Sequence, residues 1–145
     1  MSSDRRRLKR ARLLERVRTV EQRVAAAEAQ RAESVSARLE QLSRRSAAMA
    51  GHYLPGGELR DAADLRDILM LGHHLRQLGD MARRQAGDAR MQADRRLAEL
   101  AVADRRLKHS TQQHRSIADA LSRESGDAMS QARRGQHRKA GTLLD

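Results

Sequence analysis

The sequence predicts an all-α protein in which two long helices form an antiparallel coiled-coil hairpin, the second helix being the longer. Leu, Val and Ile account for only 25 of 145 residues, too few for a globular core, whereas Ala, Leu, Glu, Lys and Arg account for 80. This composition is typical of coiled coils, which bury only a narrow seam. Apolar residues recur three and four positions apart in two long segments. A single strong break, Pro55-Gly56-Gly57, separates these segments.

The first helix is predicted over about residues 4–50, where no Pro or Gly occurs. Spacings of three and four indicate a helix with one apolar face. A first register consists of Leu13, Val17, Val20, Val24 and Ala27. After a one-residue skip, a second register continues with Ala32, Val35, Leu39, Leu42, Ser46 and Met49.

The second helix is predicted over about 61–134, followed by a frayed tail at 135–145. Its seam consists of two columns of residues seven apart. One column reads Leu65, Gly72, Gly79, Ala86, Ala93, Leu100, Leu107, His114, Leu121 and Ala128. The other reads Ile68, Leu75, Ala82, Ala89, Arg96, Ala103, Ser110, Ile117, Glu124 and Gln131. The many small residues predict close approach of the two helices and low stability.

The turn is predicted at 51–60, within a single hairpin domain that spans 1–145. Pro55 disfavours the helical conformation of the preceding residue, and Gly56-Gly57 allows the chain to reverse. With the apex between residues 55 and 56, the numbers of facing residues sum to about 111. The second helix then has no intrachain partner beyond about residue 108. The apolar stripe that continues there predicts a partner-binding overhang at 107–132, with Leu107, His114, Ile117, Leu121 and Ala128 as contact residues.

Charge is distributed unevenly along the chain. The net charge is +7 over residues 1–50, zero over 51–100 and +4 over 101–145. The hairpin brings the two basic ends together, and Arg5, Arg6, Arg7, Lys9, Arg10 and Arg12 form the basic end. Such a segment suits an acidic membrane surface, an acidic protein or nucleic acid, although a charge run is usually a solvated face.

The sequence gives no sign of catalysis, of a metal or of a cofactor. There is no Cys, and the six His residues lack the spacing of a helical metal-binding pair. No apolar run is long enough to span a membrane, and the basic N-terminal segment lacks the apolar core of a secretory signal. These features predict a soluble intracellular protein that is not an enzyme.

In length and layout the chain resembles the FliJ family of flagellar export proteins and its type III secretion counterparts. The shared features are a basic N-terminal helix, the break near residue 55 and the longer second helix. The resemblance implies a cytoplasmic stalk, peripherally associated with the inner membrane, that links the hexameric export ATPase to the export gate protein. It implies ATPase contacts through the overhang. It also implies gate contacts at the turn, where Tyr53 matches the family's aromatics and Leu65, Ile68 and Leu69 replace the others.

Two other functions remain compatible with these features. One is a basic coiled coil that binds nucleic acid without sequence specificity, which a steep salt dependence would indicate. The other is a homo-oligomeric structural coiled coil in which the overhang pairs with its own copies.

Overall fold

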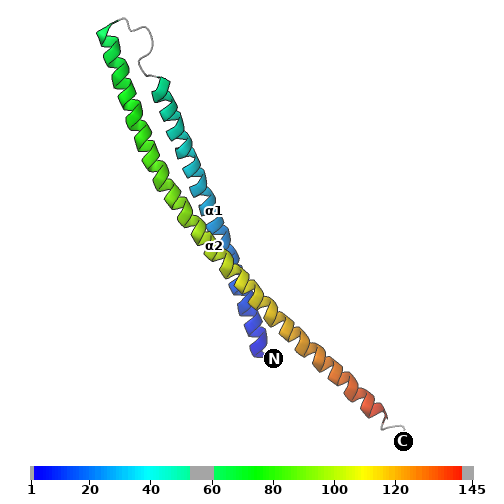
Figure 1. Ribbon diagram of the computed structural model, residues 1–145. Coiled ribbons are helices and arrows are strands. Elements are labelled where there is room, and N and C mark those ends of the chain that lie inside the picture. Colours follow the sequence, from blue (N-terminus) through cyan, green and yellow to red (C-terminus); the bar gives the residue numbers. More distant parts are fainter. Residues whose placement is uncertain (1, 53–60, 142–145) are drawn as a thin grey trace. The chain divides into compact units, whose positions relative to one another are not determined.

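The protein consists of two long α-helices that pack against each other, as the sequence predicted (Figure 1). The computed structural model describes residues 2–52 and 61–141. Helix α1 spans Ser2–His52 and helix α2 spans Ala62–Gly141, and no strand occurs among the described residues. Helix α2 continues through Gly135, beyond its predicted end at about 134. Of the predicted turn at 51–60, residues 51 and 52 belong to α1, and the rest lies outside the described residues.

Asp61 caps the beginning of the second helix. Its Oδ1 accepts a hydrogen bond from the backbone N–H of Ala63 at 3.1 Å. Its carbonyl oxygen accepts another from the N–H of Leu65 at 3.3 Å. Asp61 is therefore the N-cap residue of α2, because its side chain satisfies a backbone donor that has no partner within the helix. Asp64 adds negative charge in the first turn, where the helix dipole favours it.

The single predicted domain divides into two compact units, each containing part of both helices. Unit 1 pairs residues 2–22 of α1 with 102–141 of α2. Unit 2 pairs residues 23–52 of α1 with 62–101 of α2. In each unit the two helices run in opposite directions, which Figure 1 shows as blue against yellow-to-red and cyan against green.

The core of unit 2 consists of small side chains. Ala93 is fully buried, and Ala29, Ala82 and Ala86 are at most 7% exposed. Gly79 lies so close to α1 that an added Cβ would be 3.7 Å from the Cβ of Ser46. Both predicted columns of α2 face α1 as far as Leu121 and Ile117. Their remaining members, Glu124, Ala128 and Gln131, are exposed.

The predicted seam of α1 was wrong in its first half. Leu13, Val17, Val20 and Val24 are each more than half exposed, and Ala27 is exposed as well. In the second register, Ala32, Leu39 and Ser46 face the seam, whereas Val35, Leu42 and Met49 are about half exposed. The buried or half-buried positions follow another pattern, which includes residues 4, 8, 11, 15, 18, 22, 25, 29, 32, 36, 39, 43, 46 and 50.

The physical reason lies in the continuity of the two patterns. The observed α1 pattern alternates by four and three without interruption, so it can follow the uninterrupted heptads of α2. The aliphatic pattern contains a one-residue skip, which turns it away from any straight seam. The face of α1 that packs against α2 is therefore the one with the uninterrupted repeat, although the other face is more hydrophobic.

The predicted pairing register was also wrong. In unit 2, Ser46 faces Gly79 and Glu33 binds Arg90, so that facing residue numbers sum to 125 and 123. In unit 1, Glu15 contacts His114, a sum of 129. The predicted sum of 111 placed the apex from the turn signal alone. The register is instead determined by the contacts along the two helices.

Ser36 gives a direct test of the small-residue seam. Its side chain is 1% exposed, and among the described residues its Oγ finds no hydrogen-bond partner. A buried hydroxyl without a partner is destabilising, so Ser36→Ala is expected to raise the free energy of unfolding by about 1 kcal/mol more than a surface change does. Urea unfolding followed by circular dichroism measures this difference. The control is Ser34→Ala on the exposed side of α1, which changes only helix propensity; equal effects at the two sites would contradict the expectation.

Candidate partner-binding surfaces

A polar cluster joins the two helices of unit 1. His114 on α2 places its Nδ1 2.6 Å from Oε2 of Glu15 on α1. Arg12 Nε donates a hydrogen bond of 3.4 Å to Nε2 of the same imidazole. A neutral ring with its proton on Nδ1 satisfies both contacts, because that nitrogen donates to Glu15 while Nε2 accepts from Arg12. With the His114 and Glu15 side chains 22% and 27% exposed, the cluster fixes how the helices align in unit 1.

The structure places most of the predicted ATPase contacts inside the hairpin. Leu107, His114, Ile117 and Leu121 are half-buried rather than free. Ile117 and Leu121 line a hollow together with Asp4 and Arg7 of α1. The prediction that these residues lack a neighbour within the chain was therefore wrong. The observed register places them opposite α1.

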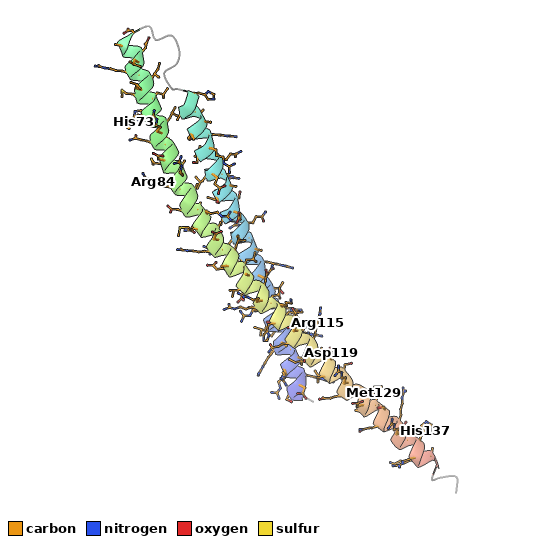
Figure 2. All side chains as sticks on the ribbon, viewed as in Figure 1. His73, Arg84, Arg115, Asp119, Met129 and His137 are labelled. Carbon is orange, nitrogen blue, oxygen red and sulfur yellow. The ribbon has the colours of Figure 1, made fainter. Side chains whose placement is uncertain are left out.

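The exposed part of α2 begins after Leu121. Every residue of α2 from 122 to 141 is exposed, including Ala128 and Met129, the latter at 63%. Figure 2 shows Met129 and His137 on the stretch of α2 that extends beyond the beginning of α1. At the beginning of this stretch, Glu124, Ser125 and Ala128 still border a hollow with Leu8 of α1. We call residues 122–141 the α2 extension; it is shorter than the predicted overhang.

The predicted gate contacts lie at the beginning of α2, except for Tyr53, which lies outside the described residues. Leu65 and Ile68 are half-buried seam residues. Leu69 is 50% exposed, and its neighbours Met70 and Leu71 are 60% and 42% exposed. The apolar surface available at this end of α2 is therefore formed by residues 69–71 more than by the seam residues.

The basic residues predicted at the N-terminal end, Arg5, Arg6, Arg7, Lys9, Arg10 and Arg12, are all exposed. Unit 1 contains 17 basic and 8 acidic residues in sequence, a net charge of +9. Unit 2 contains 13 and 11, a net charge of +2. The positive charge of the protein is thus concentrated in unit 1.

Sequence reasoning missed two exposed apolar surfaces because it assigned their residues to the seam or left them out. One comprises Leu13, Val17 and Val20 of α1 in unit 1, which we call the outer stripe. The other flanks the seam of unit 2 and comprises Val35, Leu42, Met49, Leu71 and Leu78. The sequence signal that could have identified these surfaces is a repeat of mostly small and polar residues in α1, spaced four and three positions apart. This repeat marks the inward face of α1, so that most of its aliphatic residues lie on the outside.

The described residues offer neither a membrane-spanning helix nor a metal centre. Neither helix has a stretch long and apolar enough to cross a membrane. No group of three or more His, Asp or Glu side chains in residues 2–52 and 61–141 could hold a metal ion. Comparisons with family models, with curated proteins and with solved structures found no match.

Proposed function

We propose that this protein is a non-enzymatic helical-hairpin adaptor that binds other proteins through exposed helix surfaces. In the specific form suggested by its layout, it is the stalk that links a hexameric export ATPase to the export gate of a flagellar or related secretion apparatus. The observation that carries the proposal is the α2 extension. Its residues are helical and exposed throughout, although a helix without a packing partner is only marginally stable in water.

The extension has the chemistry of a protein-binding helix. Ala128, Met129 and Ala132 provide apolar contact area, and Arg133, Arg134, Arg138 and Lys139 follow in the last turns. A partner that covers the apolar residues would stabilise the helix by the burial that α1 does not provide here. In this proposal the ATPase binds the extension and the gate binds the exposed start of α2 at residues 69–71.

Binding of the purified export ATPase from the same genome tests the proposal. The variant Ala128→Asp with Met129→Asp places two charges on the apolar contact and is expected to weaken binding by about tenfold or more, because charges buried at an interface without partners are strongly unfavourable. The control, Ser130→Asp with His137→Asp, places two Asp residues on the opposite face of the same helix and is expected to retain binding. Both variants should keep the wild-type melting curve, since all four residues are exposed.

The same purified protein distinguishes the two alternatives. Binding to arbitrary duplex DNA that falls steeply with salt, together with no affinity for the ATPase, would favour a nucleic-acid-binding protein. A dimer or larger species in sedimentation that the extension variant dissociates would favour a homo-oligomeric coiled coil. Unchanged ATPase binding by the extension variant would rule out the α2 extension as the contact surface.

A further inference from the structure

The outer stripe lies on the side of α1 opposite to α2. Leu13, Val17 and Val20 are 52%, 53% and 59% exposed. The inward positions of α1 in unit 1 include Leu8, Ala11 and Glu15. At 3.6 residues per turn, the two sets are separated by about half a turn of the helix. Helix α1 of unit 1 therefore has two faces with heptad spacing, of which α2 covers only the more polar one.

The width of the outer stripe favours a helix over a membrane as its occupant. Leu13, Val17 and Val20 are four and three positions apart, which is the narrow pattern of a coiled-coil seam, and Leu14, 41% exposed, lies at one edge of it. A helix that lies in a membrane interface has a broader apolar face, commonly with Trp or Phe. The chain contains neither residue, and the stripe consists of one Leu and two Val. One partner helix would cover a stripe of this width.

Charge indicates what kind of helix fits. When the stripe is read as a seam, Lys9 and Arg16 occupy the same flanking position one heptad apart, and Arg10 lies in line with the stripe at its N-terminal end. The acidic residues beside them already have partners: Glu15 contacts His114 and Glu21 binds Arg18 at 2.7 Å. Residues 5–20 carry eight basic residues and one acidic residue.

This charge distribution also disfavours a second copy of the chain. Two copies joined along the outer stripe would bring two strongly basic segments side by side, and like charges across an interface oppose binding. We propose that the outer stripe binds an amphipathic helix of a partner protein whose apolar seam is flanked by Asp and Glu. The apolar seam supplies the contact area, and Lys9 and Arg16 select acidic flanks and set the orientation.

The probe for this surface is a synthetic helical peptide with Leu at its two seam positions and Glu at both flanking positions of each heptad. Fluorescence anisotropy of the labelled peptide measures its binding to the full-length protein. Val17→Asp with Val20→Asp is expected to weaken binding by about tenfold or more, as loss of central apolar contacts does at protein interfaces. The control is Val35→Asp, since Val35 is an equally exposed valine on α1 in unit 2. It is expected to bind as the wild type does.

Charge selection is tested separately. The variant Lys9→Glu with Arg16→Glu is expected to bind the acidic peptide more weakly and to lose much of the salt dependence. The wild type should bind a peptide with Lys in place of Glu about tenfold more weakly than the acidic one. Circular dichroism confirms that each variant retains the helix content of the wild type, because all substituted positions are exposed.

Three outcomes would overturn the proposal. In the first, the variant Val17→Asp with Val20→Asp binds the acidic peptide as tightly as the wild type does, or Val35→Asp weakens binding as much as that variant does. In the second, the stripe variants abolish binding to vesicles of phosphatidylserine and phosphatidylcholine but leave peptide binding unchanged, so that the surface binds lipid. In the third, sedimentation shows a dimer that Val17→Asp dissociates, so that the occupant is a second copy. The tests use residues outside the α2 extension and are independent of the ATPase experiment.

Discussion

A protein with Cys at positions 46 and 79 is expected to form an intrachain disulfide under mild oxidation. The Cβ of Ser46 and the ideal Cβ position of Gly79 are 3.7 Å apart, within the range found in disulfides. The natural chain contains no Cys, so no other pairing competes. Closing a loop of this length is expected to stabilise the protein by about 3 to 4 kcal/mol and to raise Tm by more than about 10 °C. Mass spectrometry and melts with and without reductant measure both effects.

The matched control tests the register that the turn signal predicted. Under that register Ser46 would face Leu65, so Ser46→Cys with Leu65→Cys would cross-link instead. In the register of the structure this second pair is expected to remain reduced within the monomer. Cross-linking of the Leu65 variant, or equal rates for the two variants, would contradict the structure of unit 2.

The second large effect is expected at Ala93. Its side chain is fully buried between the helices of unit 2. Ala93→Asp is expected to lower the free energy of unfolding by about 3 kcal/mol or more, because removing a carboxylate from water and forcing a larger side chain into a close-packed seam are both unfavourable. Thermal unfolding followed by circular dichroism should show an early melt.

Ala98→Asp on the exposed side of α2 is the control for this substitution. Surface changes of this kind usually alter stability by less than about 0.5 kcal/mol. If the two variants melt together, the small-residue seam does not hold unit 2 together. If only Ala93→Asp melts early, the loss is due to burial and not to the helix propensity of Asp.

Much of the fold could be predicted from the sequence because heptad spacing and turn chemistry act locally. The beginning of α2 near residue 61 follows from the Pro55-Gly56-Gly57 break, and the columns from Leu65 to Leu121 follow from an uninterrupted repeat. These signals need no knowledge of the partner helix. They were sufficient for the fold class and for the inward face of α2.

The face and register of α1 could not be predicted in the same way. Val17 and Val20 suggested a seam because of their hydrophobicity, whereas Ala29 and Ser36 occupy it because they fit against the small residues of α2. Such a choice depends on both helices together. The contact between Glu15 and His114 joins residues 99 positions apart, and no local pattern indicates it. The candidate contacts Ile117 and Leu121 were misplaced for the same reason.

The seam of unit 2 also determines how alignment is specified. Ala and Gly bury similar small areas whichever of their neighbours they face, so a shift of one helix by a heptad changes the buried apolar area little. Two ion pairs join the helices in the observed alignment, Glu28 with Arg96 at 3.0 Å and Glu33 with Arg90 at 3.3 Å. In unit 2 the apolar residues hold the helices together, and the ion pairs between the helices contribute to fixing their alignment.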